Sequence, residues 1–412
     1  AMTSPQMTLA LLRQLVRYAG VPQTAIYLYE SQALIGSPIW NYLTNEFPAV
    51  HYVDNWGIQG REQAVKDYSA PINLSNGAVT EYPPAQVTDA DYLINMPTLK
   101  SHEASTGGNN NNDTDTRAEF PSLCAKNHFG SFCGGAGNLH PYQEATNYYA
   151  TYHCYVDLME HKHLGGKTML YVIDGLYGGL GHWDAIPAKW WIPPFNTNWP
   201  GSVFASQDHC AIDSVGLDFL AAERVAKADV MRGKLDNHLH EAANITNPPS
   251  GTVYDPDGDG PATRSLGVHE HWLDLESKLY SKNIDPRVNG IELVDASVIE
   301  PLSCAFVANV TSVGIGSPVI FTATVTSTFS RNVYCRWDFN NDGTTDLEGQ
   351  YLLEVTNAFP TQMYFSVKLD MSNEVAETAS MLRPNYINVV PEPVAAALLL
   401  LASCAVRRMT RA

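Results

Sequence analysis

Residues 168–175 read Thr-Met-Leu-Tyr-Val-Ile-Asp-Gly, an apolar run that stops at Asp174 and Gly175. An apolar run of this length that ends in turn residues predicts a buried strand. Three similar runs and one helical pattern lie elsewhere in the same part of the chain, at residues 25–29, 91–95, 202–206 and 209–227. Strands that alternate with helices are typical of α/β domains. We therefore predict an α/β domain over residues 1–298, with a mostly parallel sheet and flanking helices.

The ends of these predicted strands carry side chains suited to chemistry. In an α/β sheet, ligands bind beyond the carboxyl ends of the strands. Lys100 would supply a cation for an anionic ligand, His102 a proton, and Asp174 a base or a metal ligand. The candidate catalytic residues are Lys100, His102, Lys126, Asn127, Asp174, Asp208 and Asp213. For Asp208 and Asp213 the alternative role is helix capping, because both lie at the start of a predicted helix.

The histidines are confined to one part of the chain. All 13 lie between His51 and His271, so proton-transfer or transition-metal chemistry belongs to the first 298 residues. Two His two positions apart share a face only on an extended backbone. We predict a zinc or iron site whose ligands are His240, Glu241, His269 and His271. Two alternatives remain open: surface or hydrogen-bonded histidines without a metal, and metal-free acid–base chemistry.

Four motifs follow one another in order, over residues 94–102, 124–130, 173–175 and 205–213. With them the chain resembles, over roughly residues 3–290, the family catalogued as domain of unknown function 362. The resemblance implies no particular reaction. Family members usually carry further residues before the helix that Ser4 and Pro5 open, so we expect the chain to be truncated at its N-terminus. Some members contain a ferredoxin-like cluster, but this chain has no Cys-x-x-Cys pair, and we expect no iron–sulfur cluster.

A second segment, residues 303–390, shows short runs with a period of two, as in the strands of a small β-sandwich. Residues 337–343 read Trp-Asp-Phe-Asn-Asn-Asp-Gly, and Tyr364, Val367 and Leu369 follow. These residues resemble a PKD-type (polycystic-kidney-disease) Ig-like module. Modules of this type are spacers or binding modules and are not enzymes.

Two acidic loops have the oxygen spacing of a calcium-binding loop. Their candidate ligands are Asp338, Asn340, Asp342 and Asp346 in the second segment and Asp255, Asp257 and Asp259 in the first. The twelfth positions of the two loops are Gly349 and Leu266, where a calcium loop would carry a bidentate Glu. The alternative is a turn rich in Asn, Asp and Gly that binds no metal.

The tail has three parts in order: Pro391, Glu392 and Pro393; an apolar run over residues 394–406; and a basic end that includes Arg407 and Arg408. This order over residues 391–412 resembles the bacterial PEP-CTERM sorting tail, with its C-terminal apolar helix. The resemblance implies export through the inner membrane, transient anchoring there, and recognition by an exosortase-type sorting enzyme. The protein would then reach the cell surface or the extracellular matrix. The alternative is a plain C-terminal membrane anchor.

The charge limits the partners. The chain has 412 residues and a net charge of −18, from 25 Lys and Arg against 43 Asp and Glu. Affinity for nucleic acid phosphates comes mostly from Lys and Arg, so we expect no nucleic-acid partner. We expect an exported enzyme that acts on an anionic small molecule or a glycan fragment. The alternative is a non-catalytic binding protein of the surface or matrix.

Overall fold

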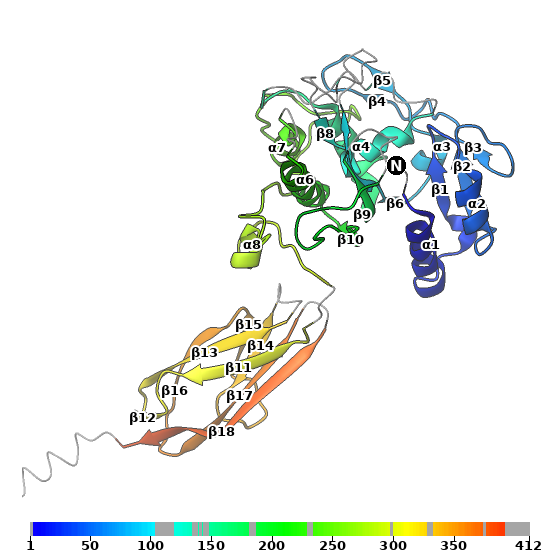
Figure 1. Cartoon of the computed structure of the whole chain (residues 1–412). Helices are drawn as coiled ribbons and strands as arrows, with labels where there is room; N and C mark the ends of the chain where they lie inside the picture. Colours follow the sequence, from blue (N-terminus) through cyan, green and yellow to red (C-terminus); the bar gives the residue numbers. More distant parts are fainter. Residues whose placement is uncertain are drawn as a thin grey trace, which may run out of the picture. The chain divides into compact units, whose positions relative to one another are not determined.

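The computed structural model describes residues 3–103, 119–133, 139, 142, 148–180, 187–228, 234–296, 300–327, 333–373 and 376–391. The chain divides into two compact units, residues 1–293 and 294–412, which we call unit 1 and unit 2. Figure 1 colours both along the sequence.

Unit 1 combines helices with short strands. Its helices are α1 (Pro5–Arg13), α2 (Ser37–Thr44), α3 (Ala85–Thr88), α4 (Cys124–Asn127), α5 (Cys154–Glu160), α6 (His209–Ala226), α7 (Asn237–Ala243) and α8 (Ser281–Ile284). Its strands are β1 (Tyr27–Glu30), β2 (His51–Asp54), β3 (Glu62–Gln63), β4 (Ile72–Asn73), β5 (Thr80–Glu81), β6 (Leu93–Asn95), β7 (Thr98–Glu103), β8 (Glu119–Pro121), β9 (Thr168–Gly179) and β10 (Ser202–Ser206).

The larger sheet of unit 1 is built around β9. Its order is β10-β9-β7-β8, and β6 also pairs with β9. Thr98 pairs with Asp174, while Asn95 pairs with Tyr171, so β6 and β7 follow one another along the same edge of β9. Both of these pairings are parallel.

The outer strands correct the prediction of a mostly parallel sheet. β10 runs antiparallel to β9, and β8 runs antiparallel to β7, so the sheet is mixed. The smaller sheet, β1-β2-β3, is parallel throughout. Both kinds of pairing bury the same apolar runs, and the hydrophobic pattern alone therefore does not fix the strand direction.

Helix α6 is the longest helix of the described part of unit 1, and it packs against the core of the sheet. Asp208 caps its N-terminus by accepting a hydrogen bond from the backbone N–H of Ala211 at 2.9 Å. The helix buries Ile212, Val215 and Leu220 in the core that contains Ile173. This packing holds α6 beside the strand ends and places its other side chains near the segment after α7.

Thr3 and Ser4, the first described residues, form hydrogen bonds with the centre of the same sheet. Ser4 caps α1, with its Oγ accepting a hydrogen bond from Met7 N, and its own N–H donates to Asp174 Oδ2 at 2.7 Å. The Thr3 hydroxyl donates to the carbonyl oxygen of Met96 at 2.6 Å. The start of α1 therefore closes over the junction of β6, β7 and β9.

Unit 2 is a β-sandwich-like module. Its strands are β11 (Ser303–Ala308), β12 (Ser312–Gly314), β13 (Pro318–Thr326), β14 (Tyr334–Asp338), β15 (Leu347–Gln350), β16 (Glu354–Ala358), β17 (Tyr364–Ser372) and β18 (Thr378–Val390). They form two sheets, ordered β11-β13-β16 and β12-β18-β17-β14-β15. Trp337 is fully buried and packs on Phe306, Phe321 and Phe339. The unit thus has an aromatic core of its own.

Candidate functional site

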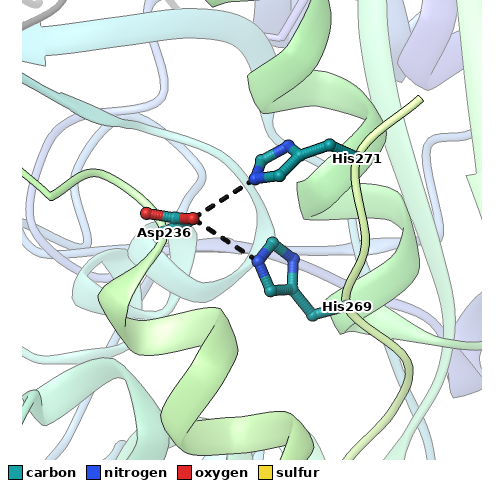
Figure 2. Close-up of side chains that lie close together, drawn as sticks. All are labelled: Asp236, His269 and His271. Carbon is teal, nitrogen blue, oxygen red and sulfur yellow. Dashed lines mark hydrogen bonds and ion pairs between the residues drawn. The ribbon is translucent and has the colours of Figure 1, made fainter. Parts of the chain in front are cut away.

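Three imidazoles converge on the carboxylate of Asp236 in unit 1. His240 lies one helical turn further along α7, and its Nε2 is 3.2 Å from Asp236 Oδ2. His269 and His271 come from the segment between α7 and α8, and their Nε2 atoms lie 3.6 and 3.2 Å from the same oxygen. Figure 2 shows both rings directed at Asp236. We call these four residues the histidine cluster.

Three members of the histidine cluster, Asp236, His269 and His271, lie close enough to one another to hold a metal ion. Metal–ligand bonds of about 2.0–2.1 Å in a tetrahedron place neighbouring ligand atoms about 3.3–3.4 Å apart. One ligand atom each from Asp236, His269 and His271 lies within 4.8 Å of the others. Within the described part of the chain, this is the one set of three or more His, Cys, Asp or Glu side chains with that proximity. An ion would draw these three ligand atoms closer together.

The protons of His269 give a second reason to place a cation here. The Ser214 hydroxyl donates its single proton to the Cys210 carbonyl at 2.6 Å, so it accepts from Nδ1 of His269 at 2.8 Å. Burial lowers the pKa of His269, which favours the neutral ring with a bare Nε2. That atom is buried, has no hydrogen-bond partner among the described residues, and faces a carboxylate oxygen. Two acceptors that face one another require a proton or a metal cation between them.

A second carboxylate orients His271. Asp218 on α6 contacts Nδ1 of His271 at 2.5 Å through Oδ1. Its other oxygen accepts hydrogen bonds from Trp272 N at 3.0 Å and from the Tyr280 hydroxyl at 2.8 Å. Carboxylate–imidazole pairs of this kind commonly fix the tautomer and orientation of metal-binding histidines. Asp218 is therefore a positioning residue that turns Nε2 of His271 toward Asp236.

The electrostatics of the cluster are strongly coupled. Burial alone would raise the pKa of Asp236, but hydrogen bonds to His240, His271 and the Tyr149 hydroxyl hold it well below its usual range. Hydrogen bonds to Asp218 and Asp236 raise the pKa of His271 to about 10. Without an ion, His271 is therefore protonated and lies beside an ionised Asp236. A metal would replace that proton.

In metal-free protein, we expect the stability of unit 1 to fall as the pH rises from about 6.5 to about 10. The pKa of His271 rises from 6.5 to about 10 on folding, so the folded state binds this proton more tightly. The stabilisation is complete below pH 6.5 and is lost as the pH passes the folded-state value. Urea unfolding of chelator-treated protein across this range measures the effect. His271→Gln should flatten the curve, and an unchanged curve would contradict this assignment.

Glu241 was predicted as a ligand, and its position corrects that prediction. Its carboxylate accepts hydrogen bonds from Ser250 N at 2.9 Å, from the Ser250 hydroxyl at 2.5 Å and from the Tyr254 hydroxyl at 3.2 Å. Consecutive residues of a helix point in different directions, so Glu241 cannot share the face of His240. Asp236, four residues before His240, supplies the carboxylate of the cluster instead of Glu241.

A separate cavity of about 250 Å³ contains two of the predicted catalytic residues, Lys100 and Asn127. Asn127 donates from Nδ2 to Asn95 Oδ1 at 2.9 Å, and Asn95 Nδ2 contacts Nε2 of His128 at 3.1 Å. Burial and the charge of His161 lower the pKa of His128 to about 3, so its ring is neutral. None of the four residues of the histidine cluster lines this cavity.

Two other predicted catalytic residues, Lys126 and His102, do not line the cavity. Lys126 is buried, and its Nζ lies 3.3 Å from the centroid of the Phe129 ring. Burial holds the pKa of Lys126 well below its usual range, and the charge of Lys100 lowers it further. His102 lies on β7, two residues beyond Lys100, and is partly exposed. The structure thus keeps Lys100 and Asn127 together and separates Lys126 and His102 from the cavity.

The three predicted catalytic carboxylates are engaged by backbone N–H groups. Asp174 accepts from Ser4 N and Leu176 N, and Asp213 accepts from Cys124 N at 2.8 Å and Ala125 N at 3.0 Å. Asp208 caps α6 and also accepts from Val268 N at 2.9 Å, directly before His269. Both Asp208 and Asp213 therefore cap a helix, which was the alternative role. Asp208 caps α6, whereas Asp213 caps α4. Asp208 also steadies the histidine segment.

The two acidic loops are closed by contacts within the protein. In unit 2, Asp338 accepts from Asn340 N and Gly343 N, Asp346 accepts from Phe339 N, and Asp342 accepts from the Asn340 side chain. These carboxylates are thus engaged by the loop itself, and calcium binding there stays a prediction.

In unit 1, Asp255 accepts from Gly260 N at 3.2 Å, and Asp257 pairs with Nε2 of His161 at 2.7 Å. Asp259 lies 3.7 Å from Nζ of Lys162. Two of these carboxylates are thus paired with cationic side chains, and calcium binding in this loop stays a prediction.

The sorting tail lies almost entirely outside the described residues. Pro391 follows β18, whereas Glu392, Pro393, Arg407 and Arg408 lie beyond the part of the chain that the structure describes. Among the described residues, no helix has the length and apolar character needed to cross a membrane.

Solved structures similar to this chain cover about a quarter of it. One, of carbohydrate-binding modules from the β-sandwich superfamily, is 18% identical, with a TM-score of 0.20 over 23% of this chain and 36% of that one. The PKD1 domain of the Vibrio cholerae metalloprotease PrtV is 16% identical, with a TM-score of 0.18 over 22% of this chain and 99% of that one. The PKD domain of the human VPS10 domain-containing receptor SorCS2 is 14% identical, with a TM-score of 0.18 over 26% and 88%.

The family comparison identifies unit 2. No curated protein matches the chain. Residues 305–384 match the PKD domain family, in agreement with the two-sheet architecture and the buried Trp337. Residues 305–384 are therefore a PKD domain, a module that occurs in extracellular proteins.

Proposed function

We propose that unit 1 is an exported, metal-dependent enzyme whose zinc or iron ion is held by the histidine cluster. The observation that carries this proposal is the bare, buried Nε2 of His269 facing the Asp236 carboxylate, with two further imidazoles on the same oxygen. Imidazole and carboxylate ligands suit zinc and iron. A bound ion would supply Lewis acidity and would lower the pKa of a coordinated water.

The cluster is open on one side, which supports a catalytic role over a purely structural one. The His269 side chain is 3% exposed, while those of His240 and His271 are 42% and 47% exposed. Catalytic metal sites keep a position for water or substrate, whereas structural sites are closed. The rings of His240 and His271 thus border the face from which a small molecule would approach.

The surrounding residues have defined tasks in this proposal. Asp218 holds the ring of His271, Ser214 holds that of His269, and Asp208 fixes the backbone before His269. The Tyr149 hydroxyl hydrogen-bonds Asp236 and is half exposed, so it can contact a ligand at the open side. The substrate class that we propose is a small anionic molecule or a glycan fragment.

We also propose that the protein is exported and placed at the cell surface or in the matrix. The PKD domain supports export, because such modules occur in extracellular proteins. The order of residues in 391–412 supports sorting by an exosortase-type enzyme after transient insertion in the inner membrane. A resemblance of residues 3–290 to domain of unknown function 362 is compatible with this placement and adds no reaction.

Metal analysis of the full-length protein tests the proposed function. We expect about one zinc or iron ion per chain after desalting, and less than about a tenth of that in His269→Gln, since the loss of even an outer-shell partner of a metal ligand typically costs about 10–100-fold in metal affinity. His51→Gln is the matched control, because His51 lies on β2, outside the histidine cluster, and pairs with Glu62. Wild-type protein that retains no ion after incubation with zinc and iron would refute the metal site. A retained ion without turnover of any anionic or glycan substrate would favour the non-catalytic binding protein.

A further inference from the structure

The cavity that contains Lys100 is the second place in unit 1 where reactive groups meet. The cavity is lined by apolar side chains, among them Tyr27, Ile35 and Leu93, and by polar side chains that include Asn95 and Ser122. Its volume of about 250 Å³ lies below the range of about 300–1,000 Å³ typical of sites for drug-sized ligands. The cavity therefore suits a short molecule with an apolar part.

Strand pairing brings Lys100 and Ser122 together. β7 and β8 run antiparallel, and Ser122, the residue after β8, donates its backbone N–H to the Lys100 carbonyl at 2.9 Å. The two side chains both line the cavity, with Nζ of Lys100 2.8 Å from Oγ of Ser122. This is the separation expected of a nucleophile and its base.

The surroundings of Lys100 favour its neutral form. Within the described residues, no carboxylate forms an ion pair with Lys100, and its Nζ hydrogen-bonds to the Ser122 hydroxyl. Burial lowers the pKa of Lys100 to about 8. A sizeable fraction of the amine is then unprotonated near pH 8 and can accept a proton from the Ser122 hydroxyl.

We propose that Ser122 and Lys100 form a nucleophile–base dyad that hydrolyses short-chain esters or amides bound in this cavity. Oγ of Ser122 bonds to the carbonyl carbon while its proton passes to Nζ of Lys100. The bond from that carbon to the leaving oxygen or nitrogen breaks, and Lys100 returns the proton to the departing alcohol or amine. Water then attacks the acyl group on Ser122, gives one proton to Lys100, and releases the acid as that proton returns to Oγ of Ser122.

This activity goes beyond the proposed metal-dependent function, since it uses no residue of the histidine cluster. It also differs from the role first predicted for Lys100, that of a cation for an anionic ligand. The two roles respond differently to Lys100→Arg. Arginine keeps the positive charge, but its pKa is above 12, so it cannot accept a proton at neutral pH.

The test uses the full-length protein, a fluorophosphonate probe and 4-nitrophenyl acetate. We expect the probe to label Ser122, located by peptide mass spectrometry, and we expect the rate of ester cleavage to rise with pH around pH 8 as Lys100 loses its proton. Ser122→Ala should abolish labelling. Lys100→Arg should slow both reactions by about 100-fold or more, the usual contribution of a general base. A chelator should change neither rate. Failure of the dyad and failure of the proposed metal site can therefore be told apart.

Ser131→Ala is the matched control. Ser131 is also a buried serine after β8, but its Oγ pairs with the Tyr29 hydroxyl at 2.9 Å and it does not line the cavity. It should keep full labelling. Labelling at another residue, no labelling of wild-type protein, or wild-type rates in Lys100→Arg would each overturn the dyad. Thermal unfolding shows whether each variant folds. If Ser122→Ala does not fold, the identity of the labelled peptide and the rates of Lys100→Arg decide whether the dyad exists.

Discussion

Removing the metal ion from the histidine cluster is expected to destabilise unit 1 by about 4 kcal/mol when the free ion stands at about 1,000 times its dissociation constant. In the proposed metal site the ion would bind only the folded state, because Asp236, His269 and His271 come together only there. Its loss also leaves the buried Nε2 of His269 facing a carboxylate. Calorimetry of full-length protein with excess zinc and with a chelator measures the difference.

The predicted stabilisation of unit 1 by the ion can be compared with an internal reference and with a matched variant. The transition of the PKD domain should not respond to zinc, because none of the four residues lies in unit 2. In His269→Gln, zinc should no longer stabilise unit 1. A zinc-dependent shift of equal size in that variant would show that the ion binds elsewhere.

Trp337→Ala is expected to lower the free energy of unfolding of the PKD domain by about 3–5 kcal/mol, the usual effect of removing a large aromatic side chain from a core. Trp337 is fully buried, and its ring lies 5.1 Å from Phe306 and 5.7 Å from Phe339. Its Nε1 donates to the Leu352 carbonyl at 3.0 Å, a bond that alanine cannot make.

Hydrogen exchange over β14 and β17 measures this destabilisation without relying on tryptophan fluorescence. Tyr364→Ala is the control, because Tyr364 is 58% exposed at the start of β17 and its loss should change stability by no more than about 0.5 kcal/mol. A loss below about 1 kcal/mol for Trp337→Ala would mean that the sandwich does not depend on its aromatic core.

The sequence allowed much of the local structure to be predicted, and less of the tertiary arrangement. The strand at 168–175 and the helix that Asp208 caps could be predicted, because periodicity and capping are local properties. The antiparallel directions of β8 and β10 could not, because pairing partners are chosen by contacts far apart in the chain. The PKD domain was recognisable from residues 337–343, since a conspicuous local motif carried the resemblance.

Some of the site residues could likewise be predicted from the sequence, and others only from the tertiary structure. His240, His269 and His271 were visible as clustered histidines, whereas Asp236 was one acid among 43. A useful signal was its position four residues before His240, a spacing that places two side chains on one helical face. Ser122 had no sequence signal, because only the pairing of β7 with β8 brings it to Lys100.

The contacts of Thr3 and Ser4 also constrain the order in which unit 1 folds. Their partners, Met96 and Asp174, lie 93 and 170 residues further along the chain. Contacts of such long range form slowly, because a large loop must close before they contribute any stability. Helix α1 is synthesised well before β9, yet its start can dock on the sheet only after β9 has entered it.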